Sequence, residues 1–178
     1  PANALSARAL PARFGPAARP GQSQRYRIAI LSPRATQTAP GVATTAAMPV
    51  PGLAQVGLVG LAVMGQNLAL NIADHGFKIA VFNRSHAKTL ETVARAKDEN
   101  LADKVVGFET VEEFVKALER PRKIIMLVKA GAPVDATIDT LKNLLDEGDL
   151  IVDGGNEFYS NTERRSDALE AVGIRYMG

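Results

Sequence analysis

Residues 54–65 read Ala-Gln-Val-Gly-Leu-Val-Gly-Leu-Ala-Val-Met-Gly, an apolar run that leads into a glycine-containing turn. A helix-forming segment follows from Gln66, so the stretch predicts a strand, a tight turn and a helix start. Gly60 allows the turn and the close approach of a pyrophosphate, and Gly65 allows the helix to pack against the sheet. Ala62 stands at the usual middle glycine. The pattern predicts a dinucleotide-binding unit with phosphates at the helix amino end; an ordinary strand, turn and helix is the alternative.

A second strand is predicted at residues 77–82, and Asn83-Arg84-Ser85 follows it. NAD-binding folds usually place an acidic residue here, which accepts hydrogen bonds from the adenosine ribose. Asn83 is neutral, and the guanidinium of Arg84 suits a 2′-phosphate, which a carboxylate would repel. The residues therefore favour NADP over NAD, and an ordinary exposed arginine at a strand end is the alternative.

Strands and helices alternate along residues 53–178, and strands such as 124–128 and 150–152 are apolar throughout. This is typical of a parallel sheet covered on both faces, so we expect an α/β fold with a Rossmann-like, doubly wound, mostly parallel sheet. The strand carboxyl ends would share one rim, where ligands bind in such sheets. The expected strands are near 54–59, 77–82, 104–106, 122–128, 149–152 and 174–177, and the expected helices near 64–75, 86–97, 110–118, 134–146 and 161–172.

Four motifs together make the chain recognisable. They are Gly-Leu-Ala-Val-Met-Gly-Gln-Asn at 60–67, Asn-Arg-Ser at 83–85, Leu-Val-Lys-Ala-Gly at 127–131 and Asp-Gly-Gly-Asn-Glu-Phe-Tyr-Ser-Asn-Thr-Glu-Arg-Arg at 153–165. In this order and spacing they resemble the amino-terminal domain of the 6-phosphogluconate dehydrogenase family, the decarboxylating enzymes. The resemblance runs from about residue 54 to residue 178. The last motif separates this branch from the wider β-hydroxyacid dehydrogenases.

The resemblance implies an NADP site along the rim. Lys129 would line the cofactor with its neighbours, and a plain surface position is the alternative for its ammonium group. Asn156 would touch both the cofactor and the substrate 6-phosphogluconate. The implied cofactor-binding residues are Gly60, Leu61, Ala62, Val63, Met64, Gly65, Asn83, Arg84, Ser85, Val128, Lys129, Ala130 and Asn156.

Other polar residues of the last motif have simpler expected roles. We expect Asp153 to cap the turn after its strand rather than act in catalysis. Glu157, Asn161 and Thr162, together with Arg164 and Arg165, are expected at a helix start and on a solvated face.

The implied reaction oxidises 6-phosphogluconate with NADP and then releases carbon dioxide, giving ribulose 5-phosphate in the pentose phosphate pathway. In the family the catalytic lysine and glutamate, and the helical domain that forms the homodimer, lie beyond the position of Gly178. We therefore expect no catalytic residue in this chain, and neither His75 nor His86 follows a strand on the rim. An incomplete piece of the enzyme is favoured because the sequence stops at a strand end. The alternatives are a short non-catalytic NADP(H)-binding module, or a β-hydroxyacid dehydrogenase of another substrate.

Residues 1–52 are expected to be a disordered leader and 53–178 the NADP-binding domain. The first 50 residues contain six arginines and no acidic residue, a charge of +6 against −4 for the remainder. Ala, Arg, Pro, Ser and Thr dominate without an apolar period, which is typical of an organelle transit peptide. Seven prolines between positions 1 and 49 disfavour a long presequence helix and so favour a plastid. A mitochondrial or cytoplasmic protein is the alternative.

The composition excludes several classes of site. The chain has no cysteine, so it has no disulfide, cysteine-ligated metal or thiol nucleophile, and we expect no metal site. No apolar run approaches the roughly 18 residues that span a bilayer. The sequence pI of about 9.1 comes from the leader, so it does not indicate nucleic-acid binding. The expected partner is a small molecule.

Overall fold

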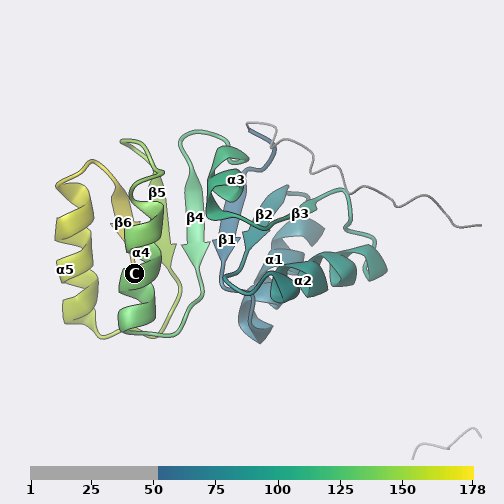
Figure 1. The fold of residues 1–178 in the computed structure, drawn as a ribbon, viewed down its shortest axis with the longest axis horizontal. Helices are drawn as coiled ribbons and strands as arrows, with labels where there is room; N and C mark the ends of the chain where they lie inside the picture. Colours follow the sequence, from purple (N-terminus) through teal and green to yellow (C-terminus); the bar gives the residue numbers. More distant parts are fainter. Residues whose placement is uncertain (1–51) are drawn as a thin grey trace, which may run out of the picture. The chain divides into compact units, whose positions relative to one another are not determined.

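The computed structural model describes residues 52–178. Of the expected leader, residues 1–51 lie outside this range. The described chain alternates six strands with five helices, as the sequence predicts (Figure 1). The strands are β1 (Val56–Val59), β2 (Ile79–Phe82), β3 (Val105–Phe108), β4 (Lys123–Met126), β5 (Leu150–Asp153) and β6 (Arg175–Met177). The helices are α1 (Val63–Asp74), α2 (His86–Asp98), α3 (Val111–Lys116), α4 (Ala132–Leu141) and α5 (Tyr159–Glu170).

The six strands form one parallel sheet in the order β3-β2-β1-β4-β5-β6. The order reverses direction between β1 and β4, which is the doubly wound arrangement, so the expected fold class is confirmed. Val59 is in register with Phe82 on one side and Met126 on the other, and Met126 is in register with Asp153. The chain therefore leaves four adjacent strands at the same level, and this edge is called the carboxyl rim below.

Two apolar layers hold the helices to the sheet. One layer joins α1 and α2 to one face through residues such as Leu58, Leu70 and Val81. The other joins α3, α4 and α5 to the opposite face around Phe114 and Ile138. Right-handed crossovers cause this division, because the chain winds away from β1 in opposite directions in its two halves. In Figure 1, α4 and α5 lie side by side over the β5 and β6 half.

Helix α4 differs from the expected range 134–146 at both ends. It begins at Ala132 with Pro133 in its first turn, where proline lacks an N–H that the helix does not need. It ends at Leu141, because the following residues make tight turns; Leu144 N–H donates to the Leu141 carbonyl over 2.8 Å. The Asp149 carboxylate then accepts from Asp146 N–H at 2.9 Å, which holds the chain in a non-helical path into β5.

Candidate dinucleotide-binding site

The glycine turn is tightly packed against the rest of the rim. Gly60 has φ of 99°, and a Cβ there would overlap the Leu127 carbonyl oxygen and lie 2.7 Å from its carbon. A Cβ on Gly65 would overlap the Gly60 carbonyl oxygen. Both positions therefore require glycine, for the turn at Gly60 and for close helix packing at Gly65, as the sequence predicts.

The amino end of α1 opens onto the carboxyl rim. Its N-cap is Ala62, no side chain caps the first turn, and that turn has no acidic residue. Val63 and Met64 are 75% and 73% exposed. Uncapped N–H groups and the positive end of the helix dipole suit an anion such as a pyrophosphate. Leu61, by contrast, is fully buried, so only its backbone faces the rim.

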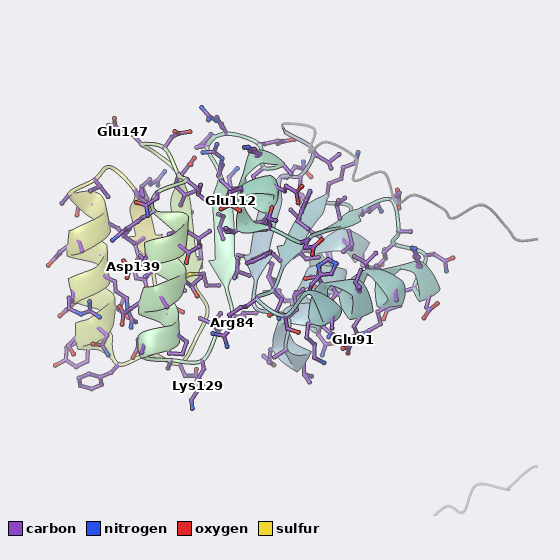
Figure 2. The ribbon with its side chains drawn as sticks, viewed as in Figure 1. Arg84, Glu91, Glu112, Lys129, Asp139 and Glu147 are labelled. Carbon is purple, nitrogen blue, oxygen red and sulfur yellow. The ribbon has the colours of Figure 1, made fainter. Side chains whose placement is uncertain are left out.

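Asn83 ties β2 to the glycine turn. Its Oδ1 accepts from Leu61 N–H at 3.0 Å, and its Nδ2 donates to the Ser85 carbonyl at 3.1 Å. The side chain therefore shapes the turn that carries Arg84. Arg84 and Ser85 are exposed, and Arg84 projects at the carboxyl rim (Figure 2). Within residues 52–178, no hydrogen bond or ion pair engages the Arg84 guanidinium.

The loop after β4 lies between the glycine turn and the loop after β5. A Cβ on Gly60 would lie 3.1 Å from Val128 Cγ1, and a Cβ on Gly155 would lie 3.4 Å from the Val128 carbonyl oxygen. Lys129 and Ala130 are exposed, and Lys129 projects from the same edge as Arg84 (Figure 2). The structure thus brings the separate sequence motifs together around Val128.

The loop after β5 is shaped by Asp153, which is 6% exposed. Its Oδ1 accepts from Gly155 N–H at 3.0 Å, and its Oδ2 accepts from the Tyr176 hydroxyl at 2.8 Å. The expected role of Asp153 as a turn cap is confirmed. Burial, followed by this bond to Asp153, raises the pKa of Tyr176. Asn156 is exposed at the end of the turn, and among the described residues its side chain has no hydrogen-bond partner.

The expectation for Arg165 was wrong. Arg164 is exposed as expected, but Arg165 is only 2% exposed. Its guanidinium pairs with Asp135 on α4 at 2.9 Å and with Glu157 before α5 at 2.7 Å. The partners lie 30 and 8 positions away, so no local sequence pattern could reveal the pairing. Glu157 also explains why α5 begins at Tyr159, two residues early, since it accepts from Phe158 N–H and from Asn161.

Gln66 is a second residue whose role sequence reasoning missed. It is 5% exposed at the start of α1, and its Nε2 donates to the Leu61 carbonyl at 3.3 Å and to Glu91 on α2 at 3.1 Å. Hydrogen bonds from Lys88 and then from Gln66 lower the pKa of Glu91. Gln66 therefore braces the glycine turn against α2. An amide just inside a helix start is the only sequence signal for this role.

We expect acid to weaken the junction formed by Arg165. Hydrogen bonds from Arg165 hold the pKa of Asp135 at about 2 and that of Glu157 at about 2, against ordinary values of 3.8 and 4.5. Their ionised forms stabilise the fold above about pH 4.5, and this stabilisation is lost as the pH falls towards about 2. The difference in melting temperature between wild type and Glu157→Gln should therefore shrink over that window.

The control for this measurement is Glu163→Gln, because Glu163 is exposed on the same helix and makes no ion pair within residues 52–178. Its melting temperature should follow that of the wild type at every pH. If the melting temperature of the wild type exceeds that of Glu157→Gln by the same amount down to about pH 2, the ionised carboxylate of Glu157 is not the source of the stabilisation.

The described residues show neither of two other kinds of site. No group of three or more His, Cys, Asp or Glu side chains in residues 52–178 is arranged to hold a metal ion. None of the helices in that part of the chain has the length and apolar character to cross a membrane.

Comparison with known proteins gives consistent matches. The family model described as the NAD binding domain of 6-phosphogluconate dehydrogenase matches residues 55–178. A spinach protein, "6-phosphogluconate dehydrogenase, decarboxylating 1", is 61% identical over 125 residues, which are 70% of this chain and 26% of that protein. The spinach protein "6-phosphogluconate dehydrogenase, decarboxylating 2, chloroplastic" is 55% identical over 124 residues, 70% of this chain and 23% of that protein.

A solved structure is also similar. Plasmodium falciparum 6-phosphogluconate dehydrogenase, studied in its apo form and with NADP+ and 6-phosphogluconate, superposes with a TM-score of 0.65 at 51% identity. The match covers 68% of this chain and 26% of that chain. The chain therefore spans about a quarter of the length of the relatives it matches.

Proposed function

Because the chain belongs to the 6-phosphogluconate dehydrogenase family, whose NAD-binding domain matches residues 55–178, we propose that it binds NADP(H) along the carboxyl rim. The observation that carries this proposal is the uncapped amino end of α1 beside two glycines that admit no Cβ. A dinucleotide backbone needs both features, close approach and unpaired N–H donors. The relative from Plasmodium falciparum is described in complex with its cofactor NADP+.

Each part of the cofactor has a proposed set of contacts. The backbone of residues 60–65 holds the pyrophosphate, with Ala62, Val63 and Met64 exposed at its surface. Arg84 and Ser85 bind the 2′-phosphate, and Asn83 shapes their turn. Val128, Lys129 and Ala130 line the nicotinamide half, beside Asn156. A bound nicotinamide would supply hydride-acceptor chemistry, and these residues would hold and orient it for that purpose.

The wider role follows from the family. We propose that the protein takes part in the oxidative decarboxylation of 6-phosphogluconate to ribulose 5-phosphate, as a homodimer. Asn156 would contact this substrate as well as the cofactor, since its amide offers a donor and an acceptor. Residues 1–52 would be a transit peptide before a binding domain at 53–178. Their composition and the chloroplastic spinach relative support a plastid location, which expression of a fluorescent fusion in plant cells would test.

Replacing Arg84 by alanine is expected to weaken NADP binding roughly 10- to 100-fold, the range for losing a charge-assisted contact with a phosphate. NAD has no 2′-phosphate, so its affinity should stay within about twofold of the wild-type value. Titration calorimetry with both nucleotides measures the two effects on the same protein.

Lys78→Ala is the matched control for Arg84→Ala. Lys78 is exposed immediately before β2, at the opposite end of the same strand, and its removal changes the net charge equally. Both nucleotides should bind this variant as they bind the wild type. Equal losses of NADP and NAD in Arg84→Ala would overturn the assignment of Arg84 to the 2′-phosphate.

A further inference from the structure

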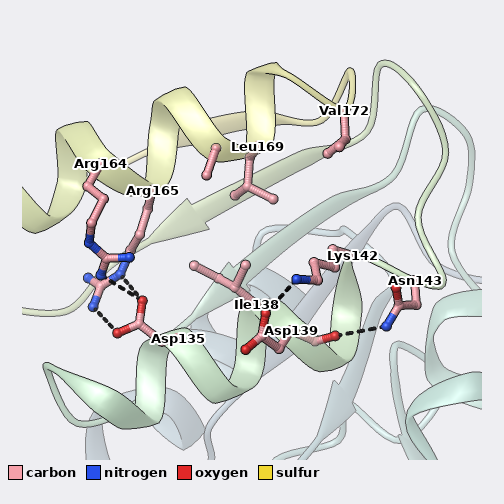
Figure 3. A pocket seen from close by; sticks show the side chains of 10 residues that line it. Asp135, Ile138, Asp139, Lys142, Asn143, Arg164, Arg165, Leu169 and Val172 are labelled. Carbon is pink, nitrogen blue, oxygen red and sulfur yellow. Dashed lines mark hydrogen bonds and ion pairs between the residues drawn. The ribbon is translucent and has the colours of Figure 1, made fainter.

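Arg165 is a charged side chain that is 2% exposed and reaches from α5 to α4. Its Nε donates to Asp135 Oδ1 at 2.9 Å and its Nη2 to Asp135 Oδ2 at 3.1 Å, which is a forked arginine–carboxylate pair. Its Nη1 donates to Glu157 Oε2 at 2.7 Å. In Figure 3 the guanidinium reaches from α5 across to Asp135 on α4, at one end of the groove between these helices.

The hydrogen bonds among Arg165, Asp135 and Glu157 form a network, and this network holds Gly131 on both sides. Its N–H donates to Glu157 Oε2 at 2.8 Å, and its carbonyl accepts from Arg165 Nη2 at 3.2 Å. Gly131 has φ of 88° and ψ of −139°, a conformation that L-residues rarely adopt. The two bonds therefore fix the backbone where the loop after β4 turns into α4.

The network joins two loops of the proposed cofactor site. Gly131 directly follows Val128, Lys129 and Ala130, and Glu157 directly follows Asn156. Asp153 caps the Gly155 turn, and its Oδ2 lies 3.9 Å from Arg165 Nη1. Lys129, Ala130 and Asn156 are exposed, and within residues 52–178 none of their side chains makes a hydrogen bond. Their positions therefore depend on the backbone that the network holds.

We infer that Arg165 is a positioning residue: it sets the spacing of the loops after β4 and β5 that the nicotinamide half of the dinucleotide requires. This inference rests on the proposed function, because it presumes that NADP(H) binds along the rim. Arg165 acts through Gly131 and Glu157 and does not itself touch the ligand. The adenosine half binds beside Arg84 at the end of β2, and β1 separates β2 from the strands β4 and β5 whose loops the network joins.

The test uses Arg165→Lys, which keeps the positive charge but cannot fork between Asp135, Glu157 and the Gly131 carbonyl. Affinities for NADPH and for 2′,5′-ADP, which lacks the nicotinamide half, are measured by titration on the whole chain. We expect NADPH to bind on the order of 10-fold more weakly, as for the loss of one or two good hydrogen bonds. The affinity for 2′,5′-ADP should change by less than about twofold.

Arg164→Lys is the matched control, since the same substitution is made one position earlier, on an exposed side chain that also pairs with Asp135. It should bind both ligands as the wild type does. Circular dichroism is used to check whether each variant is folded. If Arg165→Lys is unfolded, Asp135→Asn replaces it, because this milder change breaks the forked pair and leaves Glu157 in place.

The possible outcomes separate the inference from the proposed function. A wild-type chain that binds neither NADPH nor 2′,5′-ADP would overturn the proposed function. Binding of both by the wild type, with equal losses or no loss in folded Arg165→Lys, would overturn the inference alone. If Arg165→Lys and Asp135→Asn both unfold, the role of Arg165 is structural and the inference fails. A loss confined to NADPH supports it.

Discussion

Gly65→Ala is expected to abolish measurable NADP binding. Glycine to alanine inside a helix normally stabilises by about 1 kcal/mol, because alanine has the higher helix propensity. Here the new Cβ would overlap the Gly60 carbonyl oxygen, which is backbone and has no rotamer to escape into. The first turn of α1 must then move away from the glycine turn, and its N–H groups no longer converge on the pyrophosphate. Because several charge-assisted hydrogen bonds are lost, the affinity for NADP should fall by more than roughly 100-fold.

The same substitution should lower stability by about 1–3 kcal/mol, the usual cost of overpacking, instead of raising it. Urea unfolding gives the free energy, and NADPH titration gives the affinity. Gly76→Ala is the control: Gly76 has φ of 95°, but a Cβ there would meet nothing within 4 Å. Backbone strain should lower the free energy of unfolding of Gly76→Ala by about 1–2 kcal/mol, and its affinity for NADPH should be unchanged. A Gly65→Ala protein that binds NADPH normally would contradict the proposed pyrophosphate site.

Asp149→Ala is expected to cost about 3–5 kcal/mol of stability, the range for breaking a buried ion pair from one side. Arg122 is 5% exposed, and its Nη1 donates to Asp149 at 2.7 Å. Asp149 is 2% exposed and also accepts from Arg122 N–H, at 2.6 Å. Burial alone would raise the pKa of Asp149, but hydrogen bonds from Asp146 N–H and from Arg122 outweigh it, so the pKa is lowered. Without Asp149 the guanidinium would keep the Val115 carbonyl and one carboxylate, that of Asp146, which is half exposed.

Equilibrium unfolding in urea measures this loss as a shift of the midpoint at an unchanged slope. Asp139→Ala is the control, because Asp139 is 67% exposed and its pair with Lys142 should contribute at most about 1 kcal/mol. The pair of Arg122 and Asp149 lies where β4 and β5 begin, at the edge opposite the carboxyl rim. Folded Asp149→Ala should therefore bind NADPH normally. Similar losses in the two variants would show that burial does not strengthen the pair.

The sequence predicted the parts of the site that depend on local chemistry. The requirement for glycine at positions 60 and 65 follows from one turn and one helix start. The apolar strands predicted a parallel sheet, and parallel strands with right-handed crossovers bring their carboxyl ends to one rim. The turn-capping role of Asp153 is also local, since its carboxylate reaches Gly155 two positions away. The glycine positions and the Asp153 cap depend on residues within one strand–helix unit, and the sheet depends on a pattern that each unit repeats.

Sequence reasoning failed where the deciding contact joins distant segments. Arg165 was expected on a solvated face together with Arg164, and the local sequence does not identify a residue whose partner lies on α4. Gln66 was passed over for the same reason, since its partner Glu91 lies on α2. The end of α4 was placed five residues late, because the chain there is held by the pairing of Asp149 with Arg122 and not by helix propensity.

The sequence by itself therefore determined the order of the elements, the parallel sheet, the glycine turn and the family to which the chain belongs. These depend on hydrophobic periodicity and on backbone conformations that few residues allow. The tertiary structure alone decided how the loops after β4 and β5 are spaced. That spacing depends on the burial of Arg165 between α4 and α5, and a charge becomes buried only when partners from separate segments surround it.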